Sequence, residues 1–435
     1  MITLTVCLLM LAAMVFTRIP LGFILLLCGM GGIAAVHPRG TAAAVTIAQN
    51  EFLALALNYQ FSVLPLFLAM GLFVARAGLA DDLFEAANRW LGHLRGGLAM
   101  ATIVSCAGFS SLSHNSAAST ATMGRIALPV MRRYGYADGF SAGTIAAGGT
   151  LGLIIPPSGA IIIYGLLTET NLDDLFMAAL VPALMQVLCY VGVIGLIAWF
   201  KPQWLPAGSG STWSERLQSL KAVWGVLFLF MLIVVGIFFG LFTTTEAGGI
   251  GAGGALLFAI ARRRMTWKIF VECLVDTAKV ASMIYFVAAG AMVLNQFINL
   301  AGVPGTVVSY IQSLNLSPLA VVFALLLFYI ILGMFLDGFA MIFLTVPVVV
   351  PVIMGLGFDL IWWGIVLVIV VEMALISPPV GMNVFILKAS LPEVSLGDIY
   401  RGILPYFAAD IVRLLLLVLM PAIALWLPSL MRSMS

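Results

Sequence analysis

The chain has 435 residues, of which 63% are hydrophobic and only 9% charged. This composition, with a mean hydropathy of +1.16, excludes a soluble globular protein and predicts an all-α polytopic membrane protein. The net charge of +2 is too small to indicate nucleic-acid binding, and the five scattered cysteines and three separated histidines indicate neither a disulfide framework nor a metal site.

The first half of the chain divides into apolar runs separated by short polar segments. Long runs predict helices over about 2–17, 20–36, 53–75 and 175–200. The polar stretch 76–95 predicts an amphipathic helix at the membrane surface. Two further runs, 98–109 and 117–131, are too short to cross a bilayer and flank a polar tip at 110–116. We therefore expect a re-entrant helical hairpin, named hairpin 1, followed by an interrupted helix over 139–155 and 160–168.

The second half repeats this order after a polar linker at 205–221. Helices are predicted over about 222–242, 246–261 and 270–298, with a capping box from Thr243 to Glu246. Hairpin 2 is expected to comprise 318–333 and 339–354 around a tip at 334–338. The remaining elements are a second interrupted helix over 359–376 and 380–388, a polar arm at 391–402 and a last helix at 403–428.

Both interrupted helices break at a pair of prolines, Pro156-Pro157 and Pro378-Pro379. Proline removes an amide donor and restrains the residue before it, so a helix cannot continue through such a pair. A break inside the bilayer leaves backbone groups without partners, and it is tolerated where it is buried in protein or lines a wet cavity. Paired interrupted helices in two halves of one chain indicate the binding site of a transporter.

A nearly constant offset relates the two halves. Pro156 and Pro378 differ by 222 positions, as do Gly159 and Gly381. At the same offset Thr150 falls on Glu372 and Asn115 falls on Asp337, whereas Asp174 matches Asp398 at 224. Offsets of 222 to 224 hold from residue 77 to residue 398, which predicts an internal duplication.

The basic residues orient the chain in the membrane. They cluster at 76–95, 132–133, 201–221, 262–268 and 388–401, and the positive-inside rule places these segments in the cytoplasm. Alternation then predicts that both termini are periplasmic. Hairpin 1 enters from the cytoplasm and hairpin 2 from the opposite face, which gives an inverted repeat suited to alternating access.

The hairpin tips and helix breaks supply oxygen atoms of the kind that sodium prefers: hydroxyls, amide oxygens, a carboxylate and freed carbonyls. The predicted cation ligands are Ser113, Asn115, Ser116, Thr150, Gly152, Asp337, Gly338, Ser377 and Gly381. Half-helix N-termini at the same depth carry partial positive charge and suit an anionic substrate. The predicted substrate contacts are Ser116, Pro157, Ser158, Arg125, Pro379 and Asn383.

Several of these residues have a second interpretation. The serines and threonines can simply bind close-packed helices together. Asp337 can bind a cation, cap the second helix of hairpin 2, or do both. Glu372 can carry a proton or hold the helices through hydrogen bonds. Arg125 can meet a substrate carboxylate, pair with a nearby acid or extend to the surface, and His114 can titrate or simply be hydrogen-bonded within its loop.

The chain resembles the large, DctM-like membrane subunit of tripartite ATP-independent periplasmic (TRAP) transporters over essentially its whole length. The segments that carry the resemblance are 18–22, 64–67, 92–99, 149–158, 245–247, 333–338 and 377–385. The tip of hairpin 1, Ser113 to Ala118, departs from the family pattern, which usually reads Gly-Ser-Ser/Ala-Ala.

The resemblance implies an elevator mechanism with sodium as the coupling ion and no other cofactor. It also implies a periplasmic binding protein, a small four-helix membrane subunit and an organic acid anion such as a carboxylate or sugar acid as substrate. Because no fused small subunit precedes residue 1, we expect that subunit to be a separate chain. The alternatives are a stand-alone elevator carrier coupled to sodium or protons, a passive channel, and a membrane-embedded enzyme, for which the sequence shows no catalytic cluster.

An elevator transporter implies a division into scaffold and transport parts. We expect N-terminal scaffold helices and the interfacial helix at 1–96, and hairpin 1 with the first interrupted helix at 97–170. Scaffold helices and the linker follow at 171–300, and hairpin 2 with the second interrupted helix at 301–390. The arm and C-terminal helix occupy 391–435.

Overall fold

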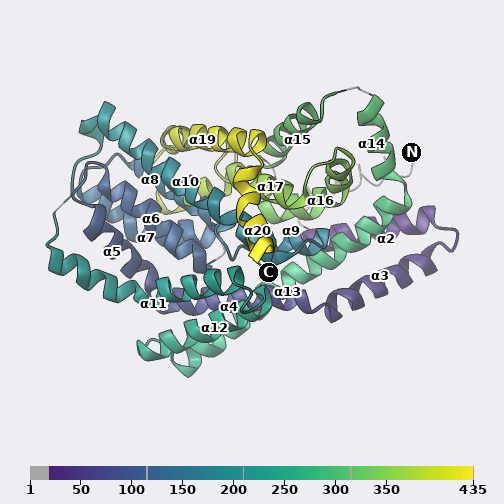
Figure 1. Cartoon of the computed structure of the whole chain (residues 1–435), viewed down its shortest axis with the longest axis horizontal. Coiled ribbons are helices and arrows are strands. Elements are labelled where there is room, and N and C mark those ends of the chain that lie inside the picture. The colour runs from purple at the N-terminus through teal and green to yellow at the C-terminus, as the bar shows by residue number, and fades with distance from the viewer. Residues whose placement is uncertain (1–18, 114–115, 209, 314–315, 335, 435) are drawn as a thin grey trace.

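The computed structural model describes residues 19–113, 116–208, 210–313, 316–334 and 336–434, and within them it is built from helices with no strand (Figure 1). The helices of the first half are α2 (Leu21–Val36), α3 (Thr41–Leu57), α4 (Val63–Arg76), α5 (Leu79–Leu91), α6 (Gly97–Ser113), α7 (Ser116–Arg133), α8 (Asp138–Thr150), α9 (Gly159–Thr168) and α10 (Leu172–Phe200). Those of the second half are α11 (Trp213–Phe238), α12 (Thr244–Ala261), α13 (Trp267–Leu300), α14 (Val303–Ser313), α15 (Pro318–Leu332), α16 (Gly338–Gly355), α17 (Leu360–Ala374), α18 (Met382–Ser390), α19 (Leu396–Leu419) and α20 (Ala422–Met434). Short 3₁₀ turns occur at Tyr59–Ser62, Leu151–Leu153 and Pro202–Trp204.

The structure confirms both hairpins and both interrupted helices. Helices α6 and α7 form hairpin 1, and α15 and α16 form hairpin 2. Helices α8 and α9 are the two parts of the first interrupted helix, and α17 and α18 are those of the second. The order hairpin, interrupted helix, long helix therefore occurs twice along the chain, as the offset of 222 to 224 predicts.

Other boundaries differ from the predicted ones. The helix predicted over 53–75 is wrong, because α3 ends at Leu57 and α4 begins at Val63. The reason is Asn58, whose side chain accepts a hydrogen bond from the Gln60 amide (2.9 Å) and so caps a new turn inside an apolar run. The helix predicted over 2–17 lies outside the described residues.

The polar linker and the polar arm are both shorter than predicted, because a helix begins inside each of them. Helix α11 begins at Trp213, because Thr212 and Glu215 form a capping box in the middle of the predicted linker. The predicted last helix over 403–428 is instead two helices, since α19 already begins after Ser395, which caps it, and ends before Pro421. Helix α14 was not predicted.

The long helices α10 and α13 each pack against several other helices. Helix α13 packs along α2, α3 and α4, whereas α10 packs against α17, α19 and α20 (Figure 1). Helix α5 lies across α6 and α11 with its apolar side buried, and Asp82 on it pairs with Arg262 after α12. The hairpins and interrupted helices pack against one another, with α7 on α8 and α18, and α16 on α9 and α17.

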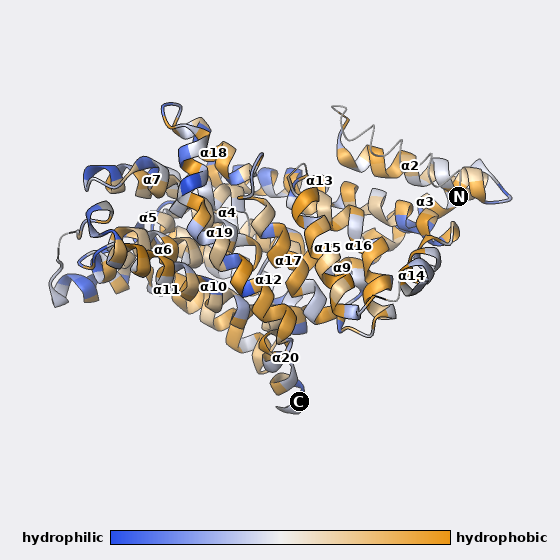
Figure 2. Cartoon of the chain, turned by 90° about the horizontal axis from the view of Figure 1, so that it is seen from above, coloured by the Kyte–Doolittle hydropathy of each residue, from blue (hydrophilic) through white to orange (hydrophobic). Residues whose placement is uncertain are grey.

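Hydrophobic residues occur along helices at the edge of the molecule as well as at its centre, as expected for a protein surrounded by lipid (Figure 2). Six helices of the described chain are long and apolar enough to cross a membrane: 59–76, 172–200, 213–238, 267–300, 338–355 and 396–419. Large side chains such as Trp199, Phe200 and Trp267 are exposed on these helices.

Candidate functional site

Both hairpin tips and both helix breaks meet at one cavity of about 140 Å³. Its lining comes from the start of α7, the first break, the tip of hairpin 2 and the second break. The residues are Ser116, Ala117, Leu153, Asp337, Gly338, Phe339, Leu375, Met382 and Asn383. One site is thus built from four segments that lie as much as 267 residues apart in the chain. Four of its lining residues were predicted from the sequence: Ser116, Asp337, Gly338 and Asn383.

Asn383 joins hairpin 1 to the second interrupted helix. Its Nδ2 donates to Ser116 Oγ (2.9 Å) and to the carbonyl oxygen of Ala146 in α8 (3.1 Å). The Ser116 hydroxyl also lies 3.1 Å from Asn383 Oδ1. Both side chains are buried, so this bridge is shielded from competing water. It fixes the start of α18 against the start of α7, where the two halves of the chain meet.

Asp337 caps α16 and also faces the cavity. One carboxylate oxygen, Oδ1, accepts hydrogen bonds from the amides of Phe339 (2.9 Å) and Ala340 (3.2 Å). Oδ2 takes no part in this cap. The side chain is exposed, and among the nine lining residues it is the only ionisable one. Asp337 therefore caps α16 through Oδ1, and its Oδ2 remains available to bind a cation.

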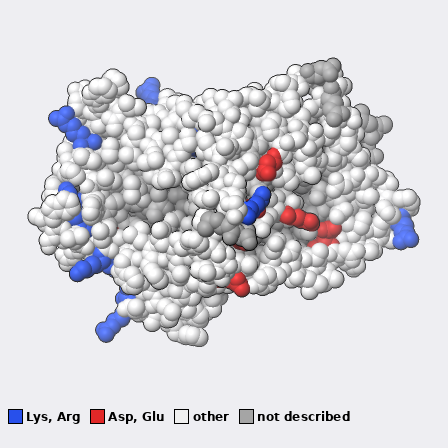
Figure 3. Space-filling model, in the orientation of Figure 1, with Lys and Arg blue, Asp and Glu red and all other residues white. Residues whose placement is uncertain are grey.

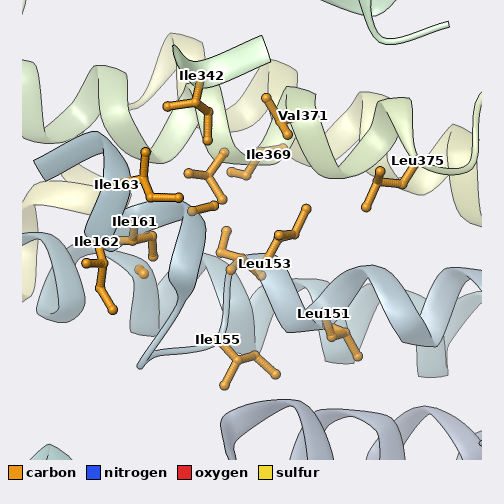
Figure 4. Packing of buried hydrophobic residues seen from close by; sticks show 14 of the residues in the cluster. Leu151, Leu153, Ile155, Ile161, Ile162, Ile163, Ile342, Ile369, Val371 and Leu375 are labelled. Carbon is orange, nitrogen blue, oxygen red and sulfur yellow. The ribbon is translucent and has the colours of Figure 1, made fainter. Parts of the chain in front are cut away.

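The first break is held by the Ser158 side chain. Its hydroxyl contacts the Leu153 carbonyl oxygen and accepts from the Ile161 amide (3.3 Å), which caps α9. Apolar side chains pack around the break, and Figure 4 shows Leu151 and Ile155 on the side of the break away from Ile369 and Val371 of the other half. The break is thus buried in protein except where Leu153 reaches the cavity.

Other predicted cation ligands lie near the cavity without lining it. The Ser113 hydroxyl lies 2.8 Å from that of Ser119, and the Ser377 hydroxyl donates to the Met373 carbonyl oxygen (2.8 Å). Gly152 is buried in the turn after α8. Gly381 precedes α18 with a φ of 57°.

The remaining predicted residues point elsewhere or fall outside the described chain. Thr150 is buried behind the cavity, where its hydroxyl donates to the Ala147 carbonyl oxygen (2.8 Å). Arg125 is exposed on α7 and outside the lining, and Pro157 is buried in the break. The Pro379 carbonyl oxygen accepts from the Tyr400 hydroxyl (2.8 Å). His114 and Asn115 lie outside the described residues.

Sequence reasoning missed two groups of residues. The first is the apolar part of the lining, Leu153, Phe339, Leu375 and Met382, which apolar runs alone do not distinguish. The second is a buried polar cluster behind the cavity, which includes Gln186 on α10 with Asp410 and Arg413 on α19. A signal was available for it, because ionisable residues in an apolar helix indicate a functional site.

The cavity combines one carboxylate with several helix N-termini. Helices α7, α16 and α18 all begin at it, with Ser116, Gly338 and Met382 as first residues. Such termini direct partial positive charge at a ligand. On the molecular face in Figure 3, acidic side chains gather near the middle, whereas most basic ones lie toward one end. The site can thus offer oxygens to a cation and the partial positive charge of helix N-termini to an anion.

Residues 8–423 match the family described as "Tripartite ATP-independent periplasmic transporter, DctM component". The chain belongs to this DctM family. It is therefore a transporter subunit and a multi-pass inner-membrane protein. Membership favours a tripartite system over a carrier that works alone.

Curated relatives support this assignment. The chain is 36% identical over 374 residues to the "C4-dicarboxylate TRAP transporter large permease protein DctM" of Pseudomonas aeruginosa, covering 86% of this chain and 87% of the relative. It is 28% identical to the "Isethionate TRAP transporter permease protein DctMQ" of Oleidesulfovibrio alaskensis, covering 92% of this chain and 62% of that longer relative.

A solved structure shares the fold. The YdaH transporter of Alcanivorax borkumensis, described as having an unusual topology, superposes with a TM-score of 0.64 at 15% sequence identity. The match covers 92% of this DctM-family chain and 98% of the transporter. Similarity at this identity shows the architecture alone.

Proposed function

We propose that this DctM-family chain imports a small organic acid anion, a carboxylate or sugar acid, by sodium-coupled alternating access. The observation that carries the proposal is the single cavity on which both hairpin tips and both helix breaks converge. Binding sites of transporters built from inverted repeats lie at the interface of the repeats, at discontinuous helices. The substrates named for the relatives, a C4-dicarboxylate and isethionate, are small organic anions.

The ion and the anion would use different parts of the cavity. Asp337 supplies a carboxylate, and Ser116 and Asn383 supply neutral oxygens, which are ligands that a hard cation accepts. The partial positive charge at the N-termini of α16 and α18 suits the anion. Because Asp337 alone would repel an anion, the anion binds well only when a cation neutralises that carboxylate. This is a physical route to coupling, since each ligand then strengthens binding of the other.

We propose the wider assembly on the basis of family membership. In the proposed elevator, 97–170 and 301–390 form the transport domain, and 1–96, 171–300 and 391–435 form the scaffold, linker and arm. A periplasmic binding protein delivers the substrate, and a separate small four-helix membrane subunit supports the scaffold. Both chain termini lie in the periplasm in this arrangement.

The test is uptake into proteoliposomes that hold this chain and its small subunit. Labelled succinate, isethionate and sialic acid are offered with and without the purified binding protein, under an inward sodium or potassium gradient. We expect uptake of one of these anions only with both sodium and the binding protein. Uptake with sodium alone would contradict the tripartite proposal, and uptake under potassium would contradict sodium coupling.

Asp337→Ala tests the cation role, and Asp359→Ala is its matched control. Asp359 caps α17 through Oδ1 just as Asp337 caps α16, accepting from Ile361 (2.7 Å) and Trp362 (3.1 Å), but it does not line the cavity. Each variant loses a cap worth about 1 kcal/mol. We expect sodium-dependent uptake to fall at least about tenfold in Asp337→Ala alone. Equal uptake by the two variants would remove Asp337 from the cation site.

A further inference from the structure

A buried cluster of polar side chains lies behind the two helix breaks. Gln186 and Tyr190 come from α10, Glu372 from the last turn of α17, and Asp410 and Arg413 from α19. Each of these five side chains is at most 1% exposed. Thr150, the last residue of α8, joins them through contacts with Gln186 (3.2 Å) and Tyr190 (3.5 Å).

The cluster is connected by hydrogen bonds that converge on two carboxyl groups. Arg413 Nη2 donates to Glu372 Oε1 and lies 3.2 Å from Asp410 Oδ1. The Tyr190 hydroxyl donates to Asp410 Oδ2 (2.6 Å), and Gln186 Nε2 donates to Glu372 Oε1. Asp410 therefore accepts a hydrogen bond on Oδ2 and has the Arg413 guanidinium beside Oδ1, and both favour its ionised form.

The charges of the cluster do not balance if both carboxyls are ionised. Among the described residues, Arg413 is the one cation that pairs with either of them. The titratable groups on the surrounding helices do not compensate. Cys189 adds no positive charge, and Tyr406, Tyr329 and Tyr164 are bound to Thr144, Thr345 and the Leu360 carbonyl. An uncompensated charge in such an interior costs several kcal/mol.

Unpartnered atoms of Glu372 and Gln186 bear on this balance. Four buried atoms of the cluster lack a hydrogen-bond partner within the described part of the chain: Glu372 Oε2, Gln186 Oε1, Arg413 Nε and Arg413 Nη1. Glu372 and Gln186 already share one hydrogen bond. A carboxylic acid and an amide can form two hydrogen bonds at once, because the acid accepts on one oxygen and donates from the other. An ionised Glu372 has no proton to donate, so it could not satisfy Gln186 Oε1.

We infer that Glu372 holds a proton, which it donates from Oε2 to Gln186 Oε1. The cluster is then neutral, with Arg413 and Asp410 as its one ion pair. Glu372 acts as a positioning residue, since its proton fastens the end of α17, next to the second break, to α10. Gln186 also contacts Thr150 at the end of α8, so the same amide holds both breaks. Thr150 and Glu372 are equivalent in the repeat, and only the second half has the acid.

Infrared spectroscopy of the full chain in lipid nanodiscs tests the proton directly, without substrate or transport. At pH 7 exposed carboxyls, with pKa values near 4, are ionised. We expect the spectrum of wild type minus Glu372→Gln to show a protonated carboxyl stretching band that shifts in heavy water. Glu272→Gln is the matched control, because Glu272 is an exposed partner of Arg76 and its removal should subtract only carboxylate bands.

A second variant tests the charge argument. Asp410→Asn leaves Arg413 with Glu372 as its only carboxyl partner, so Glu372 should ionise and the protonated band should disappear. Glu372→Gln keeps both hydrogen bonds to Gln186 and should unfold at the wild-type temperature, whereas Glu372→Ala should unfold earlier. If Glu372→Gln removes carboxylate bands instead of a protonated one, or if Asp410→Asn leaves the protonated band intact, the inference is wrong.

Discussion

The substitution Gly402→Ala tests how closely α8 and α19 pack. A Cβ atom on Gly402 would lie 2.0 Å from the Gly139 carbonyl oxygen and 3.1 Å from Phe140 Cα. Carbon and oxygen atoms of packed helices approach to about 3.3 Å, so the helices would have to separate by roughly 1.3 Å. The obstacle is backbone, which cannot rotate away as a side chain can. We expect a loss of about 3 kcal/mol in stability, the upper end of the range for overpacking.

Buried cysteines provide the assay. Cys106 is fully buried and packs against α8, where a Cβ on Gly148 would lie 2.7 Å from its sulfur. A thiol reagent reaches it only when the packing opens, so the labelling rate of the purified protein follows the opening equilibrium. A loss of about 3 kcal/mol corresponds to labelling faster by a factor on the order of 100.

Gly192→Ala is the control for the substitution itself. Gly192 lies within α10, and no atom is within 4 Å of the position its Cβ would take. Alanine should raise helix propensity there by up to about 1 kcal/mol, leaving the labelling rate unchanged or lower. If Gly402→Ala is labelled at the same rate as Gly192→Ala, the described backbone contact between α8 and α19 does not exist in the protein.

Two further outcomes are expected. Asn383→Ala removes the hydrogen bonds to Ser116 and Ala146, so the free energy of unfolding should fall by about 2–3 kcal/mol. The melting temperature and sodium-driven uptake should both fall. Asn299→Ala, at an exposed position, should change neither. Arg132 donates to Glu393 and lowers the pKa of that carboxyl. The ion pair therefore stabilises the arm at neutral pH and is lost as the pH falls below about 4. Proteolysis within 391–395 should become faster in acid for the wild type. For Glu393→Gln, which lacks the ion pair, the rate should not change with pH.

The elements that depend on local chemistry could be predicted from the sequence. Pro156-Pro157 and Pro378-Pro379 cannot lie inside a helix, so both breaks were found at the correct residues. The hairpins followed from the lengths of their apolar runs. Helix ends inside apolar runs were missed, because a single residue such as Asn58 decides them and the surrounding composition does not change.

The parts of the site that depend on tertiary packing could not be predicted. Asn383 was identified as a candidate, but its partner Ser116 lies 267 positions away and no local pattern pairs them. Asp410 and Arg413 sit in the terminal apolar helix, and only the arrangement of α10, α17 and α19 shows that they share one cluster with Glu372. The oxygen-rich tips predicted where the cavity would be, and the packing determined which residues line it.

Helix α13 also determines how deeply this protein sits in a bilayer. Its 34 residues give a length of about 51 Å, far more than the roughly 30 Å of hydrocarbon. All its charged residues lie before Val280, and residues 280–300 alone extend about 31 Å. The first third therefore emerges into the headgroups, where Glu272 pairs with Arg76. A thinner membrane would force α13 to tilt. Because α13 packs against α2, α3 and α4, its tilt would displace these helices as well.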